Sequence, residues 1–232
     1  MTEQHVAPAD DNADDFDALA ALLAAEGIAS NSDVIQPRDR TGPAPMSFAQ
    51  ELLWLIHRAD PGNTSYNVAR SRRLVGDVDT AALRRAFDAL LERHEVLRTT
   101  YAVTDQQPVQ MVRAPQPVRW HEQDLRHLPL DTREAEVSRL ARAATERPFD
   151  LAEEVPLRVQ LFRMGDAEYV LVFESHHICF DGWSRDVMFR ELRTFYEAFA
   201  NSVTPALAPL PLQFGDYAAW QRMDLQGERL EQ

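Results

Sequence analysis

The sequence has no lysine, a single cysteine and no long apolar run, and each scarcity excludes a class of protein. Every one of its 24 basic residues is an arginine, and 37 acidic residues give a formal net charge of −13. Because nucleic-acid binding depends on neutralising phosphates, this acidic balance disfavours a nucleic-acid partner. The lone Cys179 excludes an internal disulfide and fits a reducing cytoplasm. No apolar run reaches the length of a membrane span, and residues 1–15 are too acidic for a signal peptide, so we expect a cytoplasmic protein with no membrane partner.

What is present indicates one folded domain behind an acidic leader. With 45% hydrophobic and 26% charged residues, the 232 residues suffice for a sizeable core. Residues 1–14 are acidic and of low complexity, a composition that is typical of disorder. Residues 15–27 carry a stripe of phenylalanine and leucine and end in a glycine, which predicts a short amphipathic helix. A proline-containing linker completes residues 1–45, and we expect residues 46–232 to form the globular part.

Helical and strand-like patterns alternate along this globular part. Helices are predicted where apolar residues recur at helical spacing, around residues 47–54, 80–91, 131–146 and 183–200. Strands are predicted before residue 78, as a hairpin over residues 101–120, and as a pair over residues 156–162 and 168–173. Interspersed helices and hairpins predict an α/β fold, a two-layer sandwich with a mixed, largely antiparallel sheet covered by helices.

One segment combines a proton-handling side chain with a carboxylate. Residues 176–183, His-His-Ile-Cys-Phe-Asp-Gly-Trp, follow an apolar β-prone run and precede a helical pattern, so they form a strand-to-helix turn. Side chains alternate along a strand, so His176 and His177 point to opposite sides, and only one can face a given cavity. The same divergence disfavours a metal site, whose ligands must converge. The alternative is a pair of satisfied core histidines, against which the nearby Asp181 and Gly182 weigh.

The pattern His-His-x-x-x-Asp-Gly resembles the signature of the condensation domains of nonribosomal peptide synthetases, relatives of chloramphenicol acetyltransferase. Three further segments resemble motifs of that family and occur in its order. Residues 47–54 are similar to its opening motif, with Leu52 where an arginine is usual, and residues 93–101 are similar to its second. Residues 214–220 resemble its fourth motif. The resemblance therefore extends over nearly all of the chain beyond its leader.

The resemblance implies a fold, a reaction and partners. A complete condensation domain has two similar lobes, so we expect this chain to be the N-terminal lobe, without the second. The family joins a carrier-bound donor acyl thioester to a carrier-bound acceptor amine. The implied partners are peptidyl or acyl carrier proteins, a C-terminal condensation lobe and an adenylation domain. The substrates arrive on phosphopantetheine arms, with no cofactor bound directly. Tethering makes their encounter effectively intramolecular.

The resemblance also suggests a role for each residue of the turn. His177 is the position implied as catalytic, as a general base or as a hydrogen-bond partner that orients the amine. We expect His176 to be structural. Asp181 is expected to organise the turn with a basic partner, and Arg98 is the candidate for that partner. Gly182 is expected to permit a backbone turn that a Cβ would hinder, and Trp183 to line the core or the tunnel.

Several alternatives stay open. An epimerisation domain shares the two-histidine motif, whereas heterocyclisation domains carry paired aspartates that this chain lacks. A half-domain could also only bind carrier proteins. Cys179 is expected to serve packing, and most apolar residues of the other motifs to be core. The basic and acidic residues at 93–95 could be a solvated helix end. The leader helix could recruit an upstream chain or brace its own lobe.

Overall fold

The computed structural model of this chain describes residues 34–225. The chain divides into two compact units, Met1–Gln36 and Pro37–Gln232, and the helices and strands of the described residues all belong to the second unit. The leader helix predicted over residues 15–27 lies outside the described residues. Among residues 34–225, no helix is long and apolar enough to cross a membrane.

A four-stranded sheet forms the centre of this unit. Its strand order is β2-β7-β6-β5, with β7 antiparallel to both neighbours and β5 parallel to β6. The strands span Asn67–Val75 (β2), Arg119–Asp124 (β5), Leu157–Gly165 (β6) and Glu168–His176 (β7). The predicted α/β fold with a mixed, largely antiparallel sheet is confirmed, and so is the strand pair that becomes β6 and β7.

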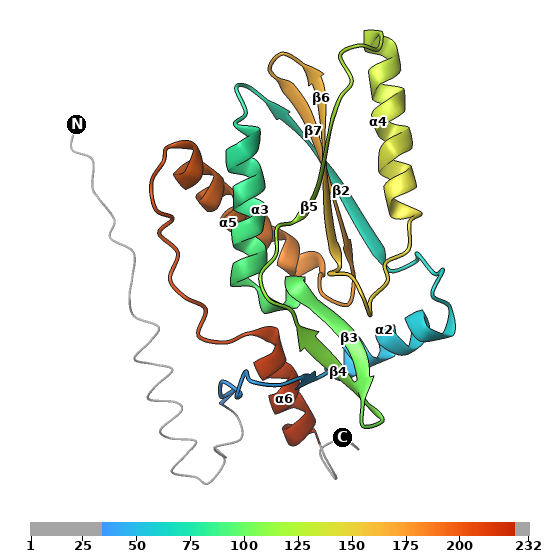
Figure 1. The fold of residues 1–232 in the computed structure, drawn as a ribbon, viewed down its shortest axis with the longest axis vertical. Helices are drawn as coiled ribbons and strands as arrows, with labels where there is room; N and C mark the ends of the chain where they lie inside the picture. The colour runs from blue at the N-terminus through green and yellow to red at the C-terminus, as the bar shows by residue number, and fades with distance from the viewer. Residues whose placement is uncertain (1–33, 226–232) are drawn as a thin grey trace, which may run out of the picture. The chain divides into compact units, whose positions relative to one another are not determined.

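Helices cover both faces of this sheet. Figure 1 shows α4 (Leu130–Thr145) on one face, and α3 (Thr80–Arg93) and α5 (Gly182–Ala200) together on the other. Each helix lies where its apolar spacing predicted one. The α3 helix begins after Asp79, whose side chain accepts a hydrogen bond from the Ala82 amide at 2.9 Å. That N-cap satisfies a backbone donor that the first turn would otherwise leave unpaired.

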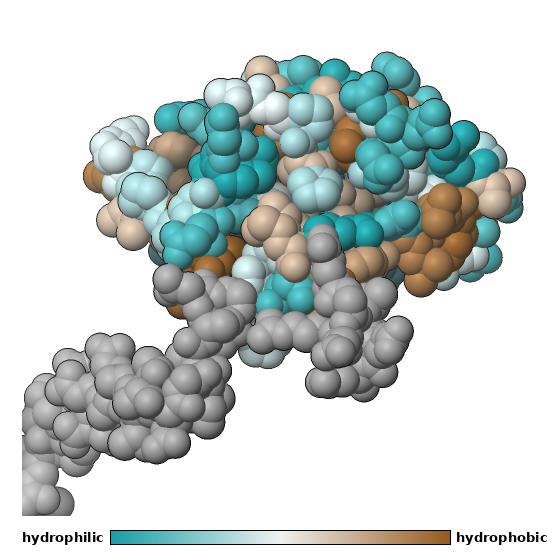
Figure 2. Space-filling view, turned by 90° about the horizontal axis from the view of Figure 1, so that it is seen from below, coloured by the Kyte–Doolittle hydropathy of each residue, from teal (hydrophilic) through white to brown (hydrophobic). Residues whose placement is uncertain are grey.

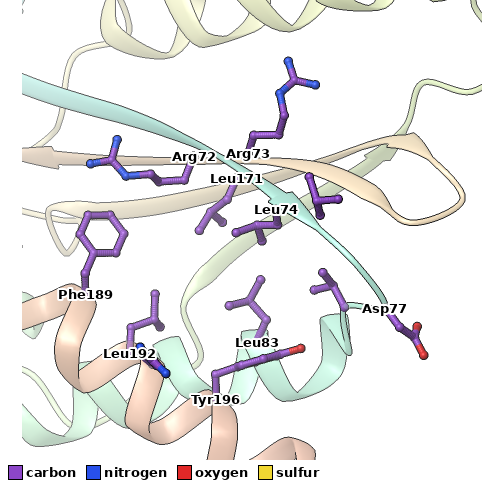
Figure 3. Close-up of a pocket in the computed structure, with 12 residues that line it drawn as sticks. Arg72, Arg73, Leu74, Asp77, Leu83, Leu171, Phe189, Leu192 and Tyr196 are labelled. Atoms are coloured by element: carbon purple, nitrogen blue, oxygen red, sulfur yellow. The ribbon is translucent and has the colours of Figure 1, made fainter.

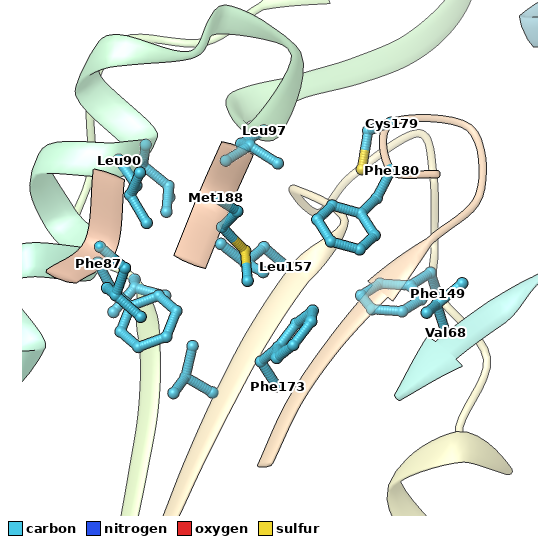
Figure 4. Close-up of a cluster of buried hydrophobic side chains, with 14 of the residues drawn as sticks. Val68, Phe87, Leu90, Leu97, Phe149, Leu157, Phe173, Cys179, Phe180 and Met188 are labelled. Atoms are coloured by element: carbon cyan, nitrogen blue, oxygen red, sulfur yellow. The ribbon is translucent and has the colours of Figure 1, made fainter. Parts of the chain in front are cut away.

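The core follows from the alternation of side chains along β6 and β7. Leu157, Leu161 and Phe173 point toward α3 and α5 and join the main buried cluster. Figure 4 shows Phe173 and Leu157 below Met188 of α5, with Phe87 and Leu90 of α3 beside them. A smaller cluster on the opposite face packs against α4 and contains Leu125, Val137, Phe162, Met164, Val170 and Val172. Both faces of β6 and β7 are buried over most of their length, which explains their continuous apolar sequence.

A second, three-stranded sheet adjoins the first. It has the order β1-β4-β3, with β1 at Ala44–Pro45, β3 at Thr99–Thr104 and β4 at Gln107–Val112. The hairpin predicted over residues 101–120 is therefore correct only as far as β4. Residues 119–124 instead form β5 of the larger sheet. Pro115 and Pro117 lie in the connection and have no amide hydrogen for a ladder, so the chain leaves the hairpin there.

Three helical segments complete the unit. They are α2 (Phe48–Ala59), the 3₁₀ helix η2 (Glu95–Arg98) and α6 (Phe214–Asp224). The α2 helix exposes Leu52, at 61% of its surface, and Leu55 on its outer face. Where its hydropathy colours are visible, Figure 2 shows many hydrophilic residues on the face seen from below and a hydrophobic patch on the side where α2 lies. A patch of this kind is typical of a surface that another protein element covers.

Candidate active site

The histidine motif lies at the end of β7, where the chain turns into α5. The backbone amide of His177 donates to the Tyr66 carbonyl at 2.9 Å, so the sheet hydrogen bonding reaches this residue. His176 is only 3% exposed, and its Nδ1 accepts from the Ile178 amide at 3.1 Å. The ring of Phe149 meets the His176 ring edge-on, with centroids 6.4 Å apart. Burial is the main cause that lowers the pKa of His176 to about 4, so this side chain is neutral at physiological pH.

His177, by contrast, is exposed. It lines a cavity of about 350 Å³. The opposite orientations of the two histidines confirm the alternation expected from the strand. The structure therefore buries the side chain of His176 and leaves the side chain of His177 exposed at the cavity wall.

All four sequence motifs contribute to the wall of this cavity. The first motif supplies Ser47, Gln50 and Leu53 from α2 and its cap, and the second supplies Val96 from η2. Residues 177–181 and Ser184 come from the histidine motif. The fourth motif supplies Phe214 and Tyr217 of α6, and Gln221 of the same helix follows directly after the motif. Segments up to 174 residues apart, from position 47 to position 221, thus meet at one place beside His177.

Gln50 is the buried link between the first motif and the turn. Its Nε2 lies 3.3 Å from the carbonyl oxygen of Ile178, 3.3 Å from the Tyr101 hydroxyl and 3.2 Å from Oε1 of Gln110. Its Oε1 accepts from the Ser47 amide at 3.1 Å. Because the amide of a buried side chain must find partners, these contacts fix the position of the turn relative to both sheets. The sequence offered only the motif resemblance as a signal for this role.

Asp181 organises the turn, but in a different way from the one predicted. It is exposed, and its Oδ1 accepts from the amide and the hydroxyl of Ser184 at 2.8 and 2.6 Å. These hydrogen bonds make Asp181 the N-cap of α5 and lower the pKa of its carboxyl group. The predicted ion pair with Arg98 is wrong, because Arg98 donates to the Arg113 carbonyl and lies 3.9 Å from Glu95. A capping carboxylate in contact with water needs no buried basic partner.

Two further predictions about the turn need correction. Gly182 is the first residue of α5 and does not have a positive φ. A Cβ built there meets no atom within 4 Å, so the turn itself does not require glycine. Trp183 is 84% exposed, so it is not a core residue. It lines a smaller cavity of about 140 Å³, together with His94 and Met188, and its place in a tunnel wall stays a prediction.

Cys179 serves packing. Its Sγ is buried, 3.2 Å from the Ser175 hydroxyl and 3.3 Å from the His176 carbonyl. Burial raises the pKa of this thiol to about 11, so little thiolate is present at neutral pH. Among residues 34–225, no group of three or more histidine, cysteine, aspartate or glutamate side chains is placed to hold a metal ion.

Charged residues of the second motif are held by buried partners rather than solvated. Glu191 of α5 contacts Arg93 Nε at 3.2 Å and His94 Nε2 at 2.6 Å. Glu95 lies 3.6 Å from Arg38. The alternative of a solvated helix end is therefore wrong. Glu191 had no sequence signal beyond its place in the predicted helix, because a glutamate on a helix is usually solvent-facing.

A clamp from the segment predicted as linker joins the second and fourth motifs. The amide of Arg38 donates to Oδ1 of Asp216 at 3.1 Å, and Arg40 Nη2 donates to Oδ2 at 3.3 Å. The carboxylate of Asp216 is fully buried. A Cβ on Gly215 would lie 2.9 Å from Arg38 Nε, so any larger residue would displace the Arg38 side chain from its present position. We call these residues, Arg38, Arg40, Glu95 and Asp216, the arginine clamp. Asp216 belongs to α6, so the arginine clamp holds the helix whose residues line the cavity.

The comparisons with known proteins agree on one family. The family model described as "Condensation domain" matches residues 41–232. A subunit of the linear gramicidin synthase of Brevibacillus parabrevis is 41% identical over 212 residues, which is 91% of this chain and 4% of that protein. The phosphinothricin tripeptide synthetase PhsB of Streptomyces viridochromogenes is 38% identical over 195 residues, or 84% of this chain and 16% of that protein. The chain thus spans a small fraction of the length of these relatives.

Solved structures show the same fold. The X-domain from teicoplanin biosynthesis is 35% identical and superposes with a TM-score of 0.74 over 84% of this chain and 41% of that one. The first condensation domain of the calcium-dependent antibiotic synthetase, solved in complex with a substrate analogue, gives a TM-score of 0.73 at 21% identity. It covers 82% of this chain and 45% of that one. In each case this chain corresponds to less than half of the solved chain.

Proposed function

This chain belongs to the condensation-domain family, and from that premise we propose that it supplies the histidine-bearing lobe of a peptide-bond-forming enzyme of nonribosomal peptide synthesis. The reaction joins a carrier-bound donor acyl thioester to a carrier-bound acceptor amine. The observation that carries the proposal is the convergence of all four motifs on the cavity beside the exposed His177. A convergent polar and apolar cavity next to a titratable side chain is the usual form of an active site.

His177 acts on the proton of the acceptor. The amine nitrogen attacks the thioester carbonyl carbon, a C–N bond forms and the C–S bond breaks. The proton that leaves the nitrogen is accepted by the imidazole and then passes to the departing thiolate, so charge and atoms balance. His177 lies at the cavity wall, and the hydrogen bond from its amide to the Tyr66 carbonyl fixes the backbone from which the imidazole extends. General acid–base catalysis of this kind contributes typically about 100- to 10,000-fold.

The rest of the turn supports this step by geometry. Asp181 caps α5 and so directs the helix away from the turn. Gly182 leaves open space where a side chain would stand, so a phosphopantetheine arm can approach the backbone. Because both substrates are tethered, positioning supplies much of the rate acceleration. Proton transfer by His177 then needs to supply only a modest share of it.

The proposed partners follow from the same family membership. Carrier proteins present both substrates, a C-terminal lobe closes the tunnel, and an adenylation domain loads the carriers. The exposed leucines of α2, Leu52 and Leu55, suit a surface that the C-terminal lobe covers. Without that lobe the cavity is open to water and neither arm is held at attack distance, so we expect the 232-residue chain alone to be inactive.

The test is reconstitution. The chain is assayed for amide formation with donor- and acceptor-loaded carrier proteins, with and without a matching C-terminal half, and its mass in solution is measured by light scattering. Amide formation that requires the second half supports the proposal. Inversion of the acceptor or donor stereocentre without amide formation would instead assign epimerisation. Robust amide formation by the monomeric chain alone would contradict the two-lobe requirement.

A second candidate function is recruitment without chemistry. It is favoured by the likeness to the teicoplanin X-domain, which has been solved in a complex with OxyB and is 33% identical in that structure with a TM-score of 0.74. For this chain, such a role predicts binding of a partner protein in the reconstitution assay and no new amide even when the second half is present.

A further inference from the structure

The β2 strand is an open edge of the four-stranded sheet. In the described part of the chain it pairs with β7 alone. The flanking hydrogen bonds, from the His177 amide to the Tyr66 carbonyl and from the Gly76 amide to the Ala167 carbonyl, set the phase of this antiparallel ladder. Even-numbered residues of β2 therefore direct their backbone groups toward β7. The odd-numbered residues, Ala69 and Ser71 among them, direct theirs outward.

Two arginines fold back over this outer edge. Arg70 Nη1 donates to the Ala69 carbonyl at 2.9 Å, and Arg72 Nη1 donates to the Ser71 carbonyl at 3.0 Å. Both acceptors are outward-facing carbonyls. Within residues 34–225, neither guanidinium has a carboxylate partner, whereas Arg73 on the opposite face pairs with Glu134 and Glu168. The edge thus carries two positive charges that no acidic side chain neutralises.

Beside these arginines, an apolar groove opens between β2 and the helices. It has a volume of about 620 Å³ and is lined mainly by apolar side chains of β2, β7, α3 and α5. Figure 3 shows Leu74 pointing into it from β2, with Leu171 behind and Phe189, Leu192 and Leu83 opposite. The guanidinium of Arg72 stands at one end, 5.2 Å from the centre of the Phe189 ring.

We propose that this edge is a docking site for an acidic, extended segment of a partner polypeptide, which adds to β2 as an antiparallel strand. Arg70, Arg72 and Leu74 alternate along β2 and so lie on its α5 face. A paired strand places its own alternate side chains against them. Read from its N-terminus, the partner carries one apolar residue opposite Leu74, then acidic residues opposite Arg72 and Arg70, each separated by one residue.

Because of the two arginines, no hydrogen bond is lost without replacement when the partner strand binds. When the partner strand arrives, its amides take over the outward carbonyls of Ala69 and Ser71. Arg70 and Arg72 are then free to pair with the two carboxylates. A second copy of this chain cannot use the same edge on itself, because antiparallel pairing of two β2 strands would set arginines against arginines. The charge of the edge therefore selects an acidic partner, and the mode of binding is strand addition.

The experiment uses the full 232-residue protein and fluorescently labelled seven-residue peptides. The parent peptide is Thr-Leu-Thr-Asp-Thr-Asp-Thr, capped at both ends. One matched peptide has both aspartates replaced by asparagine. Another is N-methylated at the two threonines that follow the aspartates, whose amides would meet the carbonyls of Ser71 and Ala69. Binding is measured by fluorescence anisotropy at low salt, because exposed charge pairs are screened.

The proposal predicts saturable binding of the parent peptide. N-methylation should weaken it by roughly 10-fold or more, since two backbone hydrogen bonds are lost. The asparagine peptide, and the Arg72→Ala protein with the parent peptide, should each bind roughly 5-fold more weakly. Arg58→Ala, an exposed arginine on α2, is the matched control and should leave binding unchanged.

Amide hydrogen exchange provides a second readout that charge attraction alone would not give. With the parent peptide, the outward amides of Ala69, Ser71 and Arg73 should exchange more slowly, while the inward amides of Arg70 and Arg72 stay as they were. Equal binding of the N-methylated and parent peptides would overturn strand addition. Equal binding of the asparagine peptide would overturn the charge selection. If the parent peptide does not bind, the arginines serve only to protect the edge from aggregation.

Discussion

The two sides of the turn after β7 are built in opposite ways. On the closed side, His176 is buried, neutral and surrounded by rings. On the open side, His177 is exposed beside a cavity, and the capping Asp181 and the first residues of α5 stand in water. The two histidines are adjacent in sequence, so residue type alone does not distinguish them. The comparison shows that the buried contacts of His176 fix the backbone of the strand end, and that this backbone presents the side chain of His177 on the opposite face.

The closed side is held by a buried ionic group behind it. Arg158 of β6 is 4% exposed, donates to the Pro148 carbonyl at 2.8 Å and stacks on Phe149, whose ring centre is 3.8 Å away. Its charge is balanced by Glu154 and by Glu174, which lies 3.6 Å away. Phe149 in turn contacts His176. On the closed side, the removal of one of these buried polar groups would leave another without its partner. The network therefore holds this side of the turn in one arrangement.

The largest expected effect is the loss of amide formation when His177, on the open side, is replaced. In a complete enzyme with its second lobe, His177→Ala should lower amide formation by about 100- to 10,000-fold, because the proton acceptor is lost. The melting temperature should hardly change, since the side chain is exposed. His127→Ala, an exposed histidine outside the cavity wall, is the control for loss of an imidazole. Unchanged turnover in the His177 variant would exclude a chemical role for it.

The arginine clamp should show a large effect on stability. Asp216→Ala removes a buried carboxylate and leaves the largely buried guanidinium of Arg38 without one of its two carboxylate partners, so unfolding should become easier by roughly 3 to 5 kcal/mol. Denaturant unfolding measures this. Asp186→Ala, an exposed carboxylate paired with the neighbouring Arg185, should leave stability nearly unchanged, because exposed ion pairs contribute little. Equal losses in the two variants would mean that the clamp does not stabilise the fold.

The burial of His176 predicts a pH dependence of intermediate size. Its pKa of about 4 in the folded state lies below the ordinary value of 6.5, so the unfolded chain takes up a proton first as the pH falls. Stability is complete above pH 6.5 and is lost toward pH 4, by about 1.4 kcal/mol per pH unit inside that window. In the His176→Gln variant, the fall of stability between pH 6.5 and pH 4 should be less steep by this amount. Parallel curves for both proteins would show that His176 titrates normally.

The smallest effect is expected at the helix cap. Asp181→Ala should cost about 1 kcal/mol of stability, the usual loss of an N-cap, and not the larger penalty of a broken buried ion pair. Asp181→Ser should restore much of it, because serine also accepts from the third amide of the helix. Thermal unfolding of the three proteins side by side is sufficient. A loss of several kcal/mol in the alanine variant would indicate a buried partner for Asp181 after all.

The sequence predicted most of the elements because their signals are local. Apolar periodicity located α3, α4 and α5, and the continuous apolar run located β7. It failed for β5, whose residues are mostly exposed and pair in parallel with β6. Parallel partners are distant in sequence and leave no turn signal between them. The predicted hairpin therefore ran too far.

For the site, the sequence located the turn but not the interactions of its charged residues. The alternation of His176 and His177 follows from strand geometry and could be predicted. The partner of Asp181 could not, because a carboxylate before a helix can cap it or pair with a distant arginine, and only exposure decides between them. Likewise, nothing in the local sequence marks Arg38 as a partner of Asp216, 178 positions away. Ion pairs formed by tertiary packing leave no periodic pattern.

One measurement tests the contrast between the two histidines most directly. The completed enzyme is treated with diethyl pyrocarbonate at neutral pH, and the modification of His176 and His177 is followed by tandem mass spectrometry together with amide formation. We expect His177 to react first, activity to fall in proportion, and hydroxylamine to restore both, while His176 reacts only after unfolding. Prompt modification of His176, or full activity with His177 modified, would contradict the assignment of one closed and one open side.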